Sequence, residues 1–147
     1  MKYSFADPLK QACAAMFGIP LEDFYDDDKK EIVNEFWGFS PRQMAQLLGT
    51  EGGRQLFRND IWIKRAEIFV NNLAPSCKVV IPDVRFENEA EFVRNNGGFI
   101  IHVKRQGVKP VSSHSSENGI WVEENDIMIE NNGSLKELYY KVGEFIK

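Results

Sequence analysis

The chain has 147 residues, of which 43% are hydrophobic and 27% are charged, and its formal net charge is -4. This size and composition are typical of one folded domain with its own core, and they exclude a wholly disordered chain. The acidic balance argues against nonspecific binding to nucleic acid, and no apolar run approaches the ~20 residues that a membrane span needs.

The first elements expected along the chain are a short strand and a helix. Residues 2–5 fit the strand, and Asp7-Pro8 predicts the start of the helix, because the missing N–H of proline costs nothing in the first turn. Gly18 ends the apolar stripe of this helix. The acidic run at residues 26–28 suits a divalent metal or a solvated loop, and we favour the loop, which consecutive carboxylates form more often.

Two more helices are expected in the first half of the chain. Ser40 and Gln43 have the spacing of a capping box, which predicts a helix that begins directly after Ser40. The glycine-rich residues 49–53 are expected to break this helix. A longer helix is expected over residues 60–73, where Trp62 and other apolar residues recur on one face.

The second half of the chain alternates strands with helices. Buried strands are expected at residues 77–83, 99–103 and 127–129. Helices are expected over residues 87–96, ended by Gly97-Gly98, and from Ser134 onward. The polar, serine-rich residues 105–118 are typical of a mobile loop. This alternation predicts an α/β fold with a mainly parallel sheet, whose ligands bind beyond the carboxyl ends of the strands.

The cysteines and histidines are too few and too scattered for a structural zinc site. Cys13 and Cys77 lie in apolar contexts and are expected to be buried thiols in a reducing compartment. The only histidines are His102 and His114. Because the N-terminus lacks the apolar stretch of a signal peptide, we expect a soluble protein of the cytoplasm.

Four sequence blocks carry most of the chemically functional residues. They are SFADPLK at 4–10, LGTEGGR at 48–54 with DIWIK at 60–64, PDVRFENEAE at 82–91, and VKRQG at 103–107 with SHSSE at 113–117. In this order they resemble the phage-type deoxynucleoside monophosphate kinases, a family of P-loop phosphotransferases, from about Tyr3 to Val142. The resemblance implies one kinase-like domain over residues 1–147, with a three-layer α/β architecture around a mainly parallel sheet and a lid-like loop at residues 105–118.

The resemblance also implies a reaction, the transfer of the γ-phosphate of ATP to a deoxynucleoside monophosphate with Mg²⁺, in the cytoplasm of the host cell if a phage encodes the protein. The implied substrate-binding residues are Lys10, Arg42, Arg54, Asp60, Trp62, Lys64, His114 and Glu117. Among these, the arginines and Lys64 suit the monophosphate, Trp62 is suited to stack on a base, and Asp60 to bind a base edge or orient an arginine.

The implied catalytic residues are Asp83, Arg85 and Arg105. Asp83 follows a predicted strand, as a Walker-B-like acid does, and would hold Mg²⁺ through water. Arg85 would reach the phosphates, and Arg105 would begin the lid that closes over ATP. Structural alternatives stay open: Arg42 and Arg54 as surface cations, Trp62 as a core residue, and Asp83 with Arg85 as an ion pair.

The glycine-rich phosphate loop of the family has no counterpart among the 147 residues, because G-x-x-x-x-G-K does not occur and residues 49–53 lack the lysine. We therefore expect weak ATP binding, impaired or absent catalysis by the isolated chain, and a sheet without its first strand. Three hypotheses follow: a nucleotide-binding protein without turnover, a kinase completed by a second chain that supplies the strand and loop, or a protein-interaction module on the same scaffold. Pairing between copies would also fill the sheet, so a homo-oligomer is a further expectation.

Overall fold

The computed structural model describes residues 1–107 and 119–145. The chain divides into two compact units, unit 1 at residues 1–84 and unit 2 at residues 85–147. Most of the predicted lid-like loop and the end of the last predicted helix lie outside the described residues. The single kinase-like domain over the whole chain stays a prediction.

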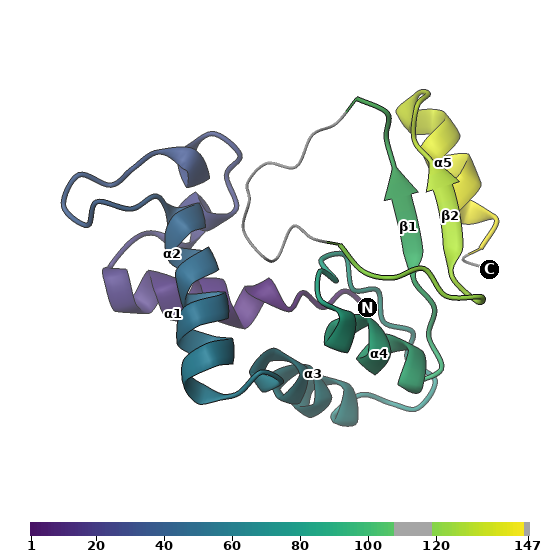
Figure 1. Ribbon diagram of the computed structural model, residues 1–147, viewed down its shortest axis with the longest axis horizontal. Helices are drawn as coiled ribbons and strands as arrows, with labels where there is room; N and C mark the ends of the chain where they lie inside the picture. Colours follow the sequence, from purple (N-terminus) through teal and green to yellow (C-terminus); the bar gives the residue numbers. More distant parts are fainter. Residues whose placement is uncertain (108–118, 146–147) are drawn as a thin grey trace. The chain divides into compact units, whose positions relative to one another are not determined.

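Unit 1 is built mainly from helices (Figure 1). They are α1 (Ala6–Phe17), the 3₁₀-helices η1 (Leu21–Phe24) and η2 (Lys29–Glu31), α2 (Pro41–Leu47), the π-helix η3 (Leu48–Phe57) and α3 (Ile61–Asn71). Cys13 and Met44 are the largest fully buried side chains of its core. Burial raises the pKa of the Cys13 thiol to about 11, as befits the expected buried thiol, while Cys77 is only partly buried.

The first helix begins differently from the prediction. α1 starts at Ala6, so Asp7 lies inside the first turn and is not the cap. The N–H groups of Phe5 and Ala6 donate instead to the two carboxylate oxygens of Asp83, at 3.0 and 2.9 Å. A carboxylate distant in sequence therefore satisfies donors that the helix leaves open. The end of α1 agrees with the prediction, since Gly18 adopts a left-handed φ of 63°.

The capping box at the start of α2 is confirmed, because the Gln43 N–H donates to Ser40 Oγ and the Ser40 N–H to the Gln43 side chain. The predicted break at residues 49–53 is wrong, because the chain continues through them as η3. Packing of Trp62 against Gly53 explains why the helix continues. A Cβ added at Gly53 would lie 2.8 Å from Cζ2 of Trp62, so the missing side chain makes room for the indole, and this packing offsets the low helix propensity of glycine.

The expected strands at residues 2–5 and 77–83 are reduced to one parallel bridge between Lys2 and Val80. The Tyr3 N–H donates to the Val80 carbonyl at 3.1 Å, and the Val80 N–H donates to Met1 at 2.8 Å. The prediction of a buried strand at 77–83 is wrong, since Val80 is 53% exposed. Its single neighbour in the described chain supplies too few ladder hydrogen bonds for a longer strand.

Unit 2 contains a small parallel sheet and two helices. Its elements are α4 (Glu87–Asn95), β1 (Ile101–Lys104), β2 (Ile127–Glu130) and α5 (Leu135–Gly143). The strands pair in parallel from Ile101 opposite Ile127 to Lys104 opposite Glu130. These elements confirm two strands and two helices predicted for the second half, although β1 begins at Ile101 and is not buried throughout, since Val103 is exposed. The mixture of helices with a two-stranded parallel sheet is compatible with the predicted α/β class, whereas the three-layer arrangement stays a prediction.

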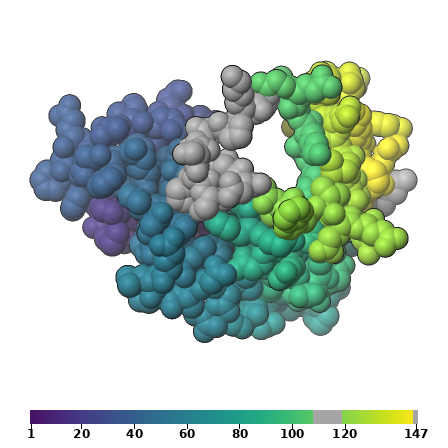
Figure 2. Space-filling view, in the orientation of Figure 1, coloured from purple at the N-terminus to yellow at the C-terminus, as the bar shows by residue number. Residues whose placement is uncertain are grey.

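Large apolar side chains are exposed at many positions of both units. In unit 1 they include Phe36 and Trp37, which lie between η2 and α2 in the blue segment of Figure 2. In unit 2 they include Leu135 and Tyr139 of α5. No helix within residues 1–107 and 119–145 is both long and apolar enough to cross a membrane.

Candidate functional site

A cluster of polar side chains surrounds the turn between η3 and α3. Arg54 is only 6% exposed on η3, and its Nη1 donates to the carbonyl of Asn59 at 2.7 Å. Arg58 forms a two-pronged ion pair with Asp60, in which Nε bonds Oδ1 and Nη2 bonds Oδ2 at 2.8 Å. The hydrogen bond from Arg58 lowers the pKa of Asp60, so this carboxylate stays ionised near neutral pH.

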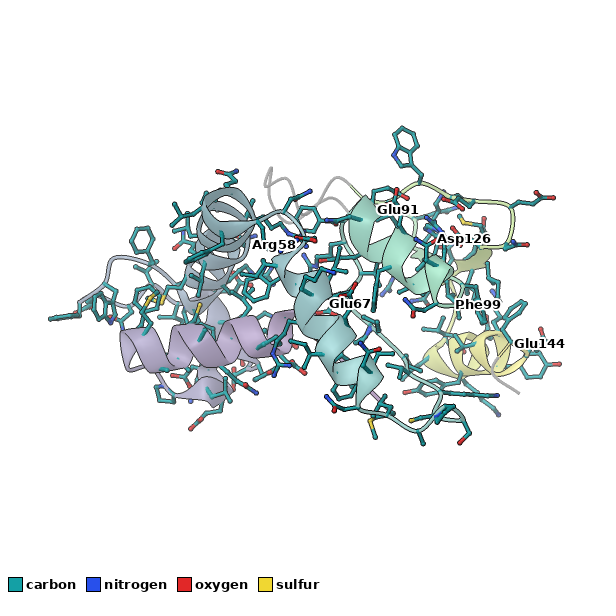
Figure 3. All side chains as sticks on the ribbon, turned by 90° about the horizontal axis from the view of Figure 1, so that it is seen from below. Arg58, Glu67, Glu91, Phe99, Asp126 and Glu144 are labelled. Carbon is teal, nitrogen blue, oxygen red and sulfur yellow. The ribbon has the colours of Figure 1, made fainter. Side chains whose placement is uncertain are left out.

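Arg58, labelled in Figure 3, has donors left over for a ligand. The ion pair uses two of its five N–H donors, and the other three have no partner in the described part of the chain. Its side chain is 59% exposed. A guanidinium that a carboxylate orients, and that is open along its remaining edge, matches the oxygens of a phosphate. Sequence analysis did not single out Arg58, although orienting an arginine was one of two roles expected for Asp60.

Trp62 joins this cluster to the core of unit 1. Its Nε1 donates to the carbonyl of Gly49 at 2.8 Å, and its ring lies against Gly53. The indole is partly buried and packs against the core cluster of α1, η1 and α2. This packing is the structural alternative considered for Trp62, and base stacking by its remaining surface stays a prediction. The structure thus brings Arg54, Asp60 and Trp62 together as neighbours of one turn.

The other two cations expected to hold the monophosphate in unit 1 each lie beside a carboxylate. Arg42 Nε is 2.6 Å from Glu31 Oε1, and Lys64 Nζ is 2.8 Å from Glu67 Oε2. All four side chains are at least a quarter exposed, so solvent screens both ion pairs. Either cation would have to share its charge with its carboxylate to bind a phosphate.

Lys10 lies on α1 with its ammonium group above an aromatic ring. Its Nζ is 3.9 Å from the centroid of the Tyr25 ring, and the Tyr25 hydroxyl donates to Asp7 Oδ1 at 2.7 Å. Burial, followed by the hydrogen bond to Asp7, raises the pKa of Tyr25 to about 12. Tyr25 is another residue that sequence analysis missed, since it belongs to none of the four sequence blocks.

Asp83 was expected to hold Mg²⁺ through water, and its carboxylate is compatible with that role. Each of its two oxygens accepts one backbone N–H, which leaves a lone pair on each for a water molecule. Three or more His, Cys, Asp or Glu side chains that could bind an ion directly do not come together in the described ranges. The Asp83 carboxylate, with a lone pair left on each oxygen, fits an ion that it would hold through water.

In unit 2, Arg105 directly follows the carboxyl end of β1, the edge of a parallel sheet where ligands are expected. It lines an open depression together with Val103, Lys104, Gln106, Glu130 and Asn132. The Gln106 N–H donates to Asn132 Oδ1 at 2.8 Å, which ties the segments after the two strands together. Arg85 precedes α4, and its N–H donates to Glu89 at 2.8 Å. His114 and Glu117 lie outside the described residues.

A second arginine cluster, missed by sequence analysis, lies in unit 2 around Asp126, which Figure 3 labels beside α4. Arg94 of α4 donates from Nε and Nη2 to the two carboxylate oxygens of Asp126, at 3.4 and 2.6 Å. Its remaining donors go to Glu87, Glu123 and the carbonyl of Trp121. His102 Nε2 lies 3.1 Å from Asp126 Oδ2. Arg94 lowers the pKa of Asp126 well below its usual range.

Comparison with known proteins places these features in a family context. A family model described as deoxynucleotide monophosphate kinase matches residues 20–142. The chain is 34% identical to a protein of Acanthamoeba polyphaga mimivirus that carries this kinase name provisionally, over 95% of this chain and 79% of the relative. It is 33% identical to the deoxynucleotide monophosphate kinase of Escherichia phage RB69, over 78% of this chain, and 30% identical to that of Enterobacteria phage T4, over 84%. The matches span 47% and 57% of the two phage kinases.

Proposed function

Because the chain belongs to the deoxynucleotide monophosphate kinase family, we propose that its unit 1 binds the phosphate group of a deoxynucleoside monophosphate. The pair of Arg58 and Asp60 carries this proposal. Asp60 fixes the direction of the guanidinium, and three exposed donors remain for phosphate oxygens. Arg54 and Trp62 lie around the same turn, where a charged phosphate and an aromatic base would find complementary side chains.

The second substrate would be ATP with Mg²⁺, as the reaction of this family requires. The ion, when bound, neutralises charge on the phosphoryl oxygens. Asp83 would hold a water molecule of the ion through the free lone pairs of its carboxylate. Arg85 and Arg105 would supply positive charge to the phosphates, with His114 and Glu117 on the lid. Lys10, Arg42 and Lys64 would complete the substrate-binding set.

The ATP phosphates also need a cradle of backbone N–H groups, and no segment of the 147 residues has the sequence of such a loop. We propose that this cradle comes from outside these residues, and that the 147 residues alone bind the monophosphate but transfer phosphate poorly. A different chain would supply both the cradle and the missing strand of a three-layer sheet, whereas a second copy, which lacks the loop as well, would only pair with the sheet. The proposed location of the reaction is the cytoplasm, where nucleotides and Mg²⁺ are present.

Calorimetric titration tests the proposal with three ligands: each deoxynucleoside monophosphate, the matching deoxynucleoside, and ATP with Mg²⁺. We expect binding of a monophosphate, binding at least tenfold weaker of the deoxynucleoside that lacks the charged phosphate, and no measurable binding of ATP. Equal affinity for nucleoside and nucleotide would contradict a phosphate site in unit 1. Binding of none of the three would overturn the nucleotide proposal and favour a protein-interaction module.

A further inference from the structure

We infer that Tyr25 is a positioning residue for Lys10, holding its ammonium group in place for the negative charge of the substrate. The inference rests on the proposed function, because it assumes that Lys10 binds the monophosphate. Tyr25 does not itself need to touch the substrate. Its role would be to narrow the range of rotamers that the flexible Lys10 side chain samples.

Two contacts fix the Tyr25 ring against one face of α1. The hydroxyl donates to Asp7 Oδ1 at 2.7 Å, and the ring face lies 3.9 Å from Lys10 Nζ. Asp7 and Lys10 are three residues apart in the same helix, so their side chains project from the same side. One aromatic side chain thus spans both, with its polar end on Asp7 and its face under Lys10.

Contacts other than the hydroxyl and the ring also hold Tyr25 in this place. Its N–H donates to the carbonyl of Glu22 at 3.0 Å and closes the short helix η1. The preceding residue, Phe24, is buried in the core of unit 1. A ring anchored by its own backbone and by its hydroxyl forms a fixed platform, whereas the lysine side chain above it has four rotatable carbon–carbon bonds.

An aromatic ring suits this task because it attracts a cation without neutralising it. The negative face of the ring stabilises the ammonium group but carries no formal charge, so the contact with Tyr25 does not itself neutralise Lys10. A phenol is protonated at neutral pH, and the raised pKa of Tyr25, about 12, extends this to more alkaline solutions. The hydroxyl can therefore continue to donate to Asp7, and no phenolate forms beside the lysine.

Nuclear magnetic resonance tests the contact without any nucleotide. Because Lys10 Nζ lies 3.9 Å from the centroid of the Tyr25 ring, we expect an upfield ring-current shift for the protons on the adjacent carbon in the wild-type chain. Tyr25→Leu removes the ring and should abolish this shift, while Tyr25→Phe keeps the ring and should retain most of it. Tyr140→Leu, at an exposed tyrosine of α5, is the matched control and should leave the shift unchanged. A Lys10 resonance that Tyr25→Leu does not move would overturn the inference.

Calorimetry then tests whether the contact serves binding. We expect Tyr25→Leu to weaken monophosphate binding about two- to fivefold, the size of a cation–π contact at an exposed site. In a Lys10→Met background the same substitution should have no further effect, because no ammonium group remains to be held. Equal weakening in both backgrounds would show a merely structural role and overturn the inference. If the wild-type chain binds no monophosphate, the proposed function fails and the positioning role fails with it, while the ring-current shift still reports on the contact.

Discussion

The two arginine clusters of this chain use the same chemistry for different ends. Arg94 of unit 2 donates all five of its N–H groups to protein acceptors, and its side chain is 13% exposed. Arg58 of unit 1 donates two to Asp60 and leaves three without a partner among the described residues. An arginine whose five donors all have protein acceptors stabilises the fold. An arginine that is oriented by a carboxylate but keeps donors without protein acceptors can bind an anion. The number of occupied donors separates the two roles more clearly than the presence of an ion pair.

The largest predicted effect is on stability, at the cluster around Arg94 in unit 2. Arg94→Met should lower the free energy of unfolding by about 3–5 kcal/mol, because it leaves the carboxylate of Asp126, 1% exposed, without its cation. Urea unfolding followed by circular dichroism measures the change. Arg58→Met in the same assay should leave the unfolding midpoint nearly unchanged, since solvent already hydrates that side chain. Similar losses of stability at both positions would contradict a stabilising role that Arg94 has and Arg58 lacks.

The same cluster should make stability depend on acid. The folded chain holds the pKa of Asp126 below its unfolded value of about 3.9, chiefly through Arg94. A lowered folded pKa contributes stability that is complete above the unfolded pKa and is lost as pH falls below it. We expect the urea midpoint to fall between pH 5 and pH 3. In Asp126→Asn the part of this fall due to Asp126 should be missing, and a parallel pH dependence in the variant would contradict the assignment.

Substitution of Arg58 in unit 1 should affect ligand binding instead of stability. Arg58→Met should weaken binding of a deoxynucleoside monophosphate about ten- to a hundredfold, the value of one or two charge-assisted hydrogen bonds. Arg58→Lys should recover part of the affinity, because it restores charge without the planar fork. Arg65→Met, at an exposed arginine of α3, is the control and should bind like the wild type. Titration calorimetry measures all three, and wild-type affinity in Arg58→Met would exclude this site.

The smallest predicted effect separates the contributions that the individual partners of Arg94 make to stability. Glu123 is 56% exposed, so Glu123→Gln should change the free energy of unfolding by less than about 1 kcal/mol, as expected for a solvent-screened ion pair. The amide can still accept a hydrogen bond from Arg94. The comparison with Arg94→Met in urea then separates the buried contact with Asp126 from its exposed neighbour. A loss as large as that of Arg94→Met would show that Glu123 is no peripheral partner.

Local signals in the sequence predicted the ends of several helices. The capping box of Ser40 and Gln43, and the glycine turns at Gly18 and Gly97, depend on residues within a few positions of one another. The helix-breaking role expected of Gly53 was wrong because Trp62, nine positions further along the chain, occupies the space that its missing side chain leaves. Helix propensity does not include such a partner.

In the candidate site, too, the sequence predicted residues that are close together in the chain and missed contacts between distant ones. Arg54, Asp60 and Trp62 were found because they share one short stretch of sequence, and the structure brings them to one turn. Two contacts join residues that are 15 or more positions apart, so no rule of local spacing predicts them. They are the contact of Tyr25 with Lys10 and the ion pair of Arg94 with Asp126. Arg58 did have a local signal, an arginine two residues before an aspartate that was expected to orient one.

The cap that Asp83 provides for α1 has a consequence for the order in which the protein is made. The first helix of the chain depends on a carboxylate almost eighty residues later, at the end of unit 1. During synthesis, the residues of α1 leave the ribosome long before residue 83 does, so Asp83 cannot yet accept the N–H groups of Phe5 and Ala6. The cap of α1 therefore forms only after the last residues of unit 1 have emerged, and unit 1 cannot complete its fold earlier.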